Sequence, residues 1–191
     1  MSTEQSKAQD VVTASSIMRP TGADSARAGG VYSVECRDAA GNLKWTDTFH
    51  NLVVNQGLQD MNAKYFTASG YTAAWFLGLV TGPGSGTTFA ATDTIASHAG
   101  WTENTAYTGN RKAVTFGTAT TADPSVISNS AAPSTFTMNA NAQTIAGAFL
   151  CSVATGTSGI LFSAGDFTGG DKLVDSGDTL SVTYTFSLDA A

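Results

Sequence analysis

The segment from Thr179 to Leu188 alternates strictly between apolar and hydroxyl side chains. Successive side chains of a β-strand point to opposite faces, so this alternation predicts a strand with one buried face. The positions expected to face the core are Leu180, Val182, Tyr184, Phe186 and Leu188. A chain that contains such a strand must build a sheet and cover one side of it.

Other segments carry the same kind of signal. Residues 31–37 and 43–49 alternate around a turn at 38–42 that is rich in Asp, Gly and Asn, which predicts a β-hairpin. The nearly all-apolar run 73–80 predicts a central strand that is buried on both faces. Further strands are expected at 112–116, 134–138, 144–151 and 159–163. Many short strands joined by turns predict an all-β fold, an antiparallel β-sandwich or a jelly roll.

Residues 55–66 are the one helical candidate. Asn55 belongs to the residue types that cap helix N-termini. Leu58, Met61 and Tyr65 recur at helical spacing, with Phe66 beside them. This pattern predicts one short helix between the hairpin and the central strand.

Residues 1–30 differ in composition from the rest of the chain. They contain no aromatic residue and many Ser, Thr, Ala and Gly, so they cannot bury enough surface to repay their own ordering entropy. We expect an extended N-terminal arm over 1–30, laid along a neighbouring subunit or partner, and a β-sandwich domain over 31–191. The residues expected to anchor the arm are Val11, Val12, Ile17, Met18 and Pro20, with Arg19 pairing an acidic residue of the partner.

The charge balance restricts the classes of partner. The net charge is −6 and only 13% of residues are charged, whereas nucleic-acid binders need clustered Lys and Arg. We therefore expect no nucleic-acid partner and no membrane partner, since no apolar run approaches the ~20 residues of a membrane span. The polar start lacks the apolar stretch of a secretory signal. Synthesis in a reducing cytoplasm is expected, with Cys36 and Cys151 as buried free thiols.

Few residues suggest catalysis. The two histidines are His50 and His98, and the Gly-x-Ser-x-Gly motif of a nucleophile elbow is absent from the sequence, so surface or structural roles are favoured for both. The acidic residues lie in turns rather than in apolar strands, where burial would raise the pKa of a carboxyl group. An enzyme that uses Asp93 and Glu103 as paired carboxylates is a less favoured possibility. The expectation is a non-enzymatic protein without a cofactor.

Two glycine-rich segments have weaker functional interpretations. Asp166, Asp171, Asp175 and Asp178 crowd into one segment and their oxygens could bind Ca²⁺, but their spacing is not that of an EF-hand loop. Asp and Gly are also ordinary β-turn residues. Residues 81–86 follow a strand, but they lack the lysine and the helix of a phosphate-binding loop. Turns are therefore favoured at both places, with no metal site.

The long loop 81–110 and the surface composition favour an assembly subunit. Loops of this length in compact domains are usually functional or make contacts, and His98 and Trp101 are expected to contact a partner. Trp101 and Tyr107 could instead line a sugar-binding groove or, as is favoured, anchor the loop in the core. Ser and Thr dominate outward positions where Lys and Glu would keep a monomer soluble. Uncharged strands of this kind invite pairing unless they are covered or assembled.

Several segments, in the same order along the chain, resemble a family of tailed-bacteriophage virion proteins. They read GNLKW at 41–45, FHNLVVNQGL at 49–58, WFLGL at 75–79, ATDTIASHAGWTE at 91–103 and GDTLSVTYTF at 177–186. The resemblance implies a non-enzymatic capsid decoration, or cement, protein on the virion surface. Such a protein would bind the outside of the major capsid protein lattice, bridge neighbouring capsomers and form a homo-oligomer, a trimer or a dimer. The alternative is a tail, neck or fibre structural or adaptor protein, with carbohydrate-binding loops.

Overall fold

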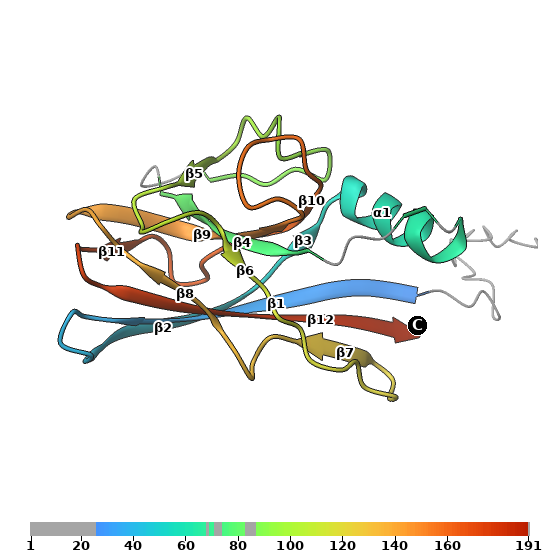
Figure 1. Ribbon diagram of the computed structural model, residues 1–191, viewed down its shortest axis with the longest axis horizontal. Coiled ribbons are helices and arrows are strands. Elements are labelled where there is room, and N and C mark those ends of the chain that lie inside the picture. Colours follow the sequence, from blue (N-terminus) through green and yellow to red (C-terminus); the bar gives the residue numbers. More distant parts are fainter. Residues whose placement is uncertain (1–25, 68, 71–73, 83–86, 191) are drawn as a thin grey trace, which may run out of the picture.

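The computed structural model describes residues 26–67, 69–70, 74–82 and 87–190. Two antiparallel sheets pack face to face as a sandwich, and helix α1 (Asn55–Phe66) lies at one end of it (Figure 1). The predicted all-β sandwich with one short helix is confirmed. The expected arm residues 1–25 lie outside the described residues.

The first sheet, called sheet A, is built around two long strands. Its order is β2–β1–β12, and the other edge of β12 pairs with β7 and β8. The bounds are β1 (Ala26–Arg37), β2 (Leu43–His50), β7 (Ser125–Ser128), β8 (Ser134–Thr137) and β12 (Thr179–Ala190). The predicted hairpin is β1 and β2, and the alternation along β12 points its apolar residues inward as predicted.

Strand β1 begins earlier than the sequence suggested. Residues 26–30, which we assigned to the arm, pair with the end of β12, with Ala26 opposite Ala190. The early start has a physical reason, because β12 offers backbone hydrogen bonds along its whole length. Residues 26–30 read Ala-Arg-Ala-Gly-Gly and contain no large apolar side chain, so they gave no alternating signal.

The second sheet, called sheet B, has the order β3–β10–β9–β4–β5. In it β11 pairs with β9 beside β10, and β6 pairs with β4 beside β5. The bounds are β3 (Leu52–Val53), β4 (Phe76–Thr81), β5 (Thr102–Asn104), β6 (Lys112–Ala113), β9 (Gln143–Cys151), β10 (Leu161–Asp166) and β11 (Lys172–Val174). The central position and double burial predicted for 73–80 are confirmed in β4.

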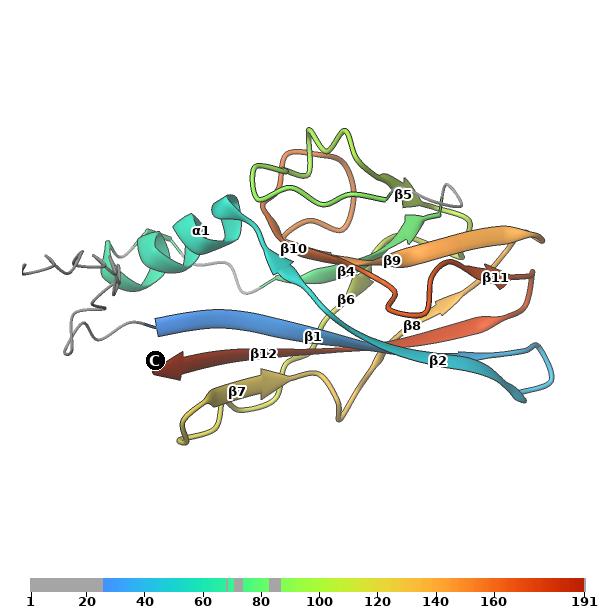
Figure 2. The same cartoon turned by 180° about the vertical axis from the view of Figure 1, so that it is seen from behind.

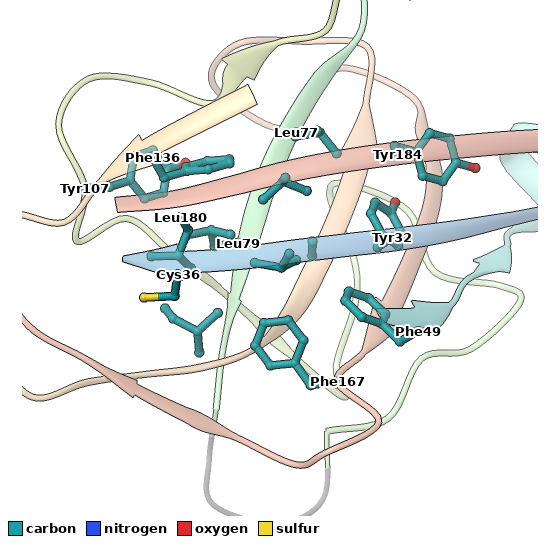
Figure 3. Close-up of a cluster of buried hydrophobic side chains, with 14 of the residues drawn as sticks. Tyr32, Cys36, Phe49, Leu77, Leu79, Tyr107, Phe136, Phe167, Leu180 and Tyr184 are labelled. Carbon is teal, nitrogen blue, oxygen red and sulfur yellow. The ribbon is translucent and has the colours of Figure 1, made fainter. Parts of the chain in front are cut away.

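The main core fills the space between the two sheets. Tyr32, Phe49 and Tyr184 stack there, with Tyr32 and Tyr184 ring centroids 4.7 Å apart (Figure 3). The two buried phenols share one partner, because the Ser163 hydroxyl lies 2.8 Å from the Tyr32 oxygen and donates to the Tyr184 oxygen over 3.4 Å. The Asn51 amide also donates to the Tyr184 oxygen. Burial raises the pKa of both tyrosines, so both phenols stay protonated.

A second, smaller core lies on the outer side of sheet B. Ile95 and Trp101 of the long loop pack there against Val80 and Phe149 of the central strands. The loop arches over sheet B in both views (Figures 1 and 2). Sheet B is therefore buried on both faces, whereas the loop leaves the outer face of sheet A uncovered.

Helix α1 has the predicted bounds but not the predicted cap. Its cap position is Val54, and Asn55 is the first helical residue. Its buried contact is made through Gly57, because a Cβ there would lie 2.5 Å from the carbonyl oxygen of Phe162. Tyr65 and Phe66, at the other end, are 83% and 76% exposed. The helix is too short to cross a bilayer, and the described part of the chain offers no other candidate span.

Candidate functional site

The long loop is fastened to its own sheet by Trp101. The indole N–H donates to Asp93 Oδ2 over 3.0 Å, and the same oxygen accepts the backbone N–H of Ala90 over 3.0 Å. The ring of His98 stacks on the indole at 3.8 Å, and its Nδ1 lies 2.9 Å from the Trp101 carbonyl oxygen. Trp101 is 5% exposed and packs against Phe149. The loop is thus held in place by one buried aromatic residue.

The favoured interpretation of Trp101 and Tyr107 as core anchors is confirmed. Tyr107 is buried in the main core with its ring edge-on to Phe136, at 4.8 Å between centroids. Neither ring presents a face on which a sugar could stack. Of the residues expected to contact a partner, Trp101 is interior and His98 is half-buried above it. The others, Val11, Val12, Ile17, Met18, Arg19 and Pro20, lie outside the described residues.

The two carboxylates considered for catalysis are each held by a separate structural partner. Asp93 accepts from Trp101 and the backbone, as above. Glu103 forms a two-pronged ion pair with Arg111, at 2.8 Å from Nε and 2.7 Å from Nη2. Arg111 is 8% exposed and its Nη1 also donates to the carbonyls of Val153 and Gly156. Glu103 raises the pKa of the Arg111 guanidinium, which acts as a charged clamp between loops.

The aspartates of the segment 166–178 do not gather into one site. Asp178 accepts from Lys44 Nζ over 2.6 Å and from the backbone N–H of Asp175 over 2.9 Å, which closes a turn. Asp166 lies apart from them, where burial and then the charge of Asp171 raise the pKa of its carboxyl group. Over the described residues, no three His, Cys, Asp or Glu side chains converge as metal ligands would. The turn interpretation is confirmed for Asp175 and Asp178.

Both cysteines are buried free thiols, as predicted. Burial raises the pKa of Cys36 from 9.0 to about 12, and burial also raises the pKa of Cys151. A thiol that stays protonated is a poor nucleophile. These two residues therefore act as small core side chains.

The uncovered outer side of sheet A forms a surface that we call the hydroxyl face. Its outward residues come from four strands and are mostly Ser and Thr: Ser33, Thr46, Thr48, Thr135, Thr137, Ser181 and Thr183. A shallow groove of about 440 Å³ runs over the part formed by β1, β2 and β12. Glu35, on the same row of β1 as Ser33, is paired with Arg37 over 2.7 Å. The sequence predicted the outward hydroxyls but not that this sheet alone would be left bare.

A second surface, which we call the α1 cleft, opens between helix α1 and sheet A. It has a volume of about 210 Å³ and its lining is almost wholly apolar. Its apolar lining residues include Met61, Trp75, Phe116, Ile127, Phe162 and Phe186, and the charged residues Asp60 and Lys64 also line it. Sequence reasoning missed this cleft, because its walls come from seven separate segments, which are α1, β7, β9, β10, β12 and the stretches at Trp75 and Phe116. The apolar residues at the end of the helical pattern were the available signal.

Comparison with protein-family models, with characterised proteins and with solved structures finds no match to this chain. The hydroxyl face and the α1 cleft are therefore the observations from which a role can be inferred.

Proposed function

We propose that this chain is a non-enzymatic bacteriophage capsid decoration, or cement, protein. In this role it binds the outside of the major capsid protein lattice and bridges neighbouring capsomers. The sequence resemblance over roughly residues 31–188 points to virion proteins, and the outer surface of the molecule is consistent with a subunit that works inside an assembly.

The hydroxyl face is the observation that carries the proposal. Soluble monomers normally cover such a sheet with charged residues, which resist contact with other proteins. Here the rows are registered across the strands, with Ser33 opposite both Thr48 and Thr183. A broad surface in which hydroxyl groups predominate loses less solvation energy than a charged surface when a protein covers it, provided that its hydroxyl groups find hydrogen-bond partners. It is therefore suited to lie against a lattice.

The rest of the molecule supplies rigidity and reach. The sandwich is fastened at its loops by the Trp101 anchor and the Arg111 clamp, so it can serve as a stiff block between capsomers. His98, half-buried above Trp101, remains the loop residue assigned to a partner contact. Val11, Val12, Ile17 and Met18 are assigned as arm anchors, with Arg19 and Pro20 beside them. Several weak contacts on one shell then act together through effective concentration.

The test is the copy number of this chain in purified virions, measured by mass spectrometry against the major capsid protein. Hundreds of copies in a fixed ratio to the shell protein would support decoration. Copies between six and a few dozen would move the protein to the neck, tail or fibres, which is the alternative proposal. Absence from the particle would overturn both.

Surface variants then test the hydroxyl face directly. Thr48→Lys and Thr183→Lys place charges on the proposed contact and should lower particle occupancy without lowering thermal stability. Thr155→Lys is the matched control, since Thr155 is exposed in a loop on the sheet B side. Equal occupancy for all three variants would contradict this contact surface.

A deletion tests the arm. Removing residues 2–24 leaves β1 whole, because β1 starts at Ala26. The shortened chain should fold and should bind particles much more weakly. Unchanged occupancy would exclude a role of the arm in binding.

A further inference from the structure

The helix and the strand that help to form the α1 cleft also carry exposed apolar side chains outside its lining. Leu58, Tyr65 and Phe66 of α1 and Leu188 of β12 are between 39% and 83% exposed. Among the residues that line the cleft only Asp60 and Lys64 are charged, and apolar surface of this kind is typical of a binding site. Its volume of about 210 Å³ is below the roughly 300 Å³ of small pockets for drug-sized ligands, but it can receive a few aliphatic side chains.

The N-terminal segment enters the fold beside this cleft. Strand β1 starts at Ala26, at the end of the sandwich where α1 and the end of β12 also lie (Figure 2). Phe186, in the cleft wall, pairs in register with Gly30. Ala26 is four residues farther along β1, which is about 13 Å of strand.

We propose that the α1 cleft binds residues 11–18 of the same chain, with the side chains of Val11, Val12, Ile17 and Met18 providing the contact. The seven residues 19–25 can span up to about 25 Å, which is longer than the distance from Ala26 to the cleft wall. Docking buries the apolar lining of the cleft and the apolar side chains of the segment against each other. Both surfaces are thereby removed from water.

The linking residues also favour a reversal of direction. Arg19, Pro20, Thr21 and Gly22 place Pro at the second and Gly at the fourth position of a possible β-turn, where both residues are preferred. A turn there sends the preceding residues back toward the sandwich instead of away from it. Docking within one chain is further favoured because the tether gives a high effective concentration.

The inference does not rest on the proposed function. In the free protein the cleft covers the apolar side chains of residues 11–18. On a capsid the same side chains would leave the cleft and bind the major capsid protein instead. The test uses the free full-length chain without particles. A failure of the virion experiments would not affect the result of this test. A failure of this test would likewise leave the proposed function open.

The experiment is hydrogen exchange of the backbone amides of residues 11–18, followed by mass spectrometry. In the unmodified chain these amides should exchange at least about tenfold more slowly than in an unstructured peptide of the same sequence. Ile127→Glu in the cleft wall and Ile17→Asp in the segment should each abolish the protection. Leu43→Glu is the control, since Leu43 is 55% exposed at the opposite end of sheet A (Figure 2).

Several outcomes would overturn the proposal. Amides 11–18 that exchange as fast as the free peptide would exclude docking, and protection retained in both Ile127→Glu and Ile17→Asp would place the segment elsewhere. If the protection of amides 11–18 from exchange increased with protein concentration, the cleft would be binding the arm of a second copy and not that of its own chain. If Ile127→Glu loses protection in β9 as well, that variant has unfolded, and Ile17→Asp decides because it changes no residue of the two sheets.

Discussion

The indole N–H of Trp101 donates to the carboxylate of Asp93 over 3.0 Å, and this bond ties the loop to the outer side of sheet B. The carboxylate also accepts the N–H of Ala90. The long loop, which the sequence suggested as a region of partner contacts, is thus bound to the outer side of its own sheet. The loop does not cover the outer face of sheet A.

Trp101→Phe should keep most of the ring packing while removing the hydrogen bond. We expect it to lower the free energy of unfolding by about 1–3 kcal/mol, because the buried Asp93 carboxylate loses a donor. Chemical denaturation measures the change. Trp45→Phe is the control, since the buried Trp45 Nε1 has no hydrogen-bond partner among the described residues. A loss as large in Trp45→Phe would show that the bond itself contributes little.

Much of the sandwich was predictable from local pattern, and its limits have physical reasons. Long strands such as β12 and β9 give a clear signal, because several successive residues alternate or are all buried. Strands β3 and β11 have 2 and 3 residues, too few to show a period, and exist because a neighbouring strand offers them hydrogen bonds. Sequence patterns report burial along a strand but not which strands become neighbours.

The candidate surfaces were less predictable than the fold. Outward hydroxyls could be read from the alternation of β12, but their isolation on one bare face depends on where the long loop folds. Trp101 illustrates the difficulty, since an aromatic residue in a loop has the same sequence signal whether it binds a partner or its own core. The α1 cleft arises from tertiary contacts alone.

Glu103→Gln should destabilise the protein strongly. It leaves the buried Arg111 guanidinium without its counter-charge, and we expect a loss of about 3 kcal/mol in the free energy of unfolding. Glu35→Gln breaks an ion pair of the same 2.7 Å length whose side chains are 45% and 42% exposed, so it should cost less than about 1 kcal/mol. Denaturant titrations should therefore give clearly different free energies of unfolding for the two variants. Equal decreases in the free energy of unfolding would contradict the role of burial.

Gly57→Ala should weaken the attachment of α1. The added methyl group meets the Phe162 carbonyl, so the helix must shift, and a cost of about 1–3 kcal/mol is expected despite the better helix propensity of Ala. Gly70→Ala is the control, because nothing lies within 4 Å of a Cβ at that position. Thermal denaturation measures both. A stabilised Gly57→Ala variant would show that the close approach is not required.

The thiols should be unreactive in the native protein. Because burial raises the pKa of Cys36 from 9.0 to about 12, a disulfide-exchange reagent at about pH 8 should label neither cysteine until the chain is unfolded. The stability that this shift supplies is complete below pH 9.0 and is lost as the pH rises toward about 12. Cys36→Ala should flatten this alkaline decline. Rapid labelling of the native protein would contradict the burial of the thiols.

Asp166→Asn should stabilise the protein slightly at neutral pH. The pKa of Asp166 is raised above 3.8, so its favourable contribution exists below that pH and disappears as the carboxyl group ionises near Asp171. We expect a higher melting temperature near pH 7, worth less than about 1 kcal/mol for this exposed side chain, and no difference near pH 3.

Asp38→Asn is the control with opposite sign. Hydrogen bonds from Asn42, and then from Ala40 and Gly41, hold the pKa of Asp38 below 3.8, so its contribution is present above that pH and lost in acid. Its removal should lower the melting temperature at neutral pH. A fall in both variants would show that removing an aspartate is harmful regardless of its neighbours.

Strands β1 and β12 lie side by side along their whole lengths, although they stand at opposite ends of the described chain. During synthesis β1 therefore has to wait for its main partner until all the residues between Arg37 and Thr179 have been made and β12 has left the ribosome. Pairing between such distant segments also makes folding slow. Until that moment the hairpin of β1 and β2 exposes an unpaired edge, so growing chains at high concentration are vulnerable to aggregation as long as β12 has not been made.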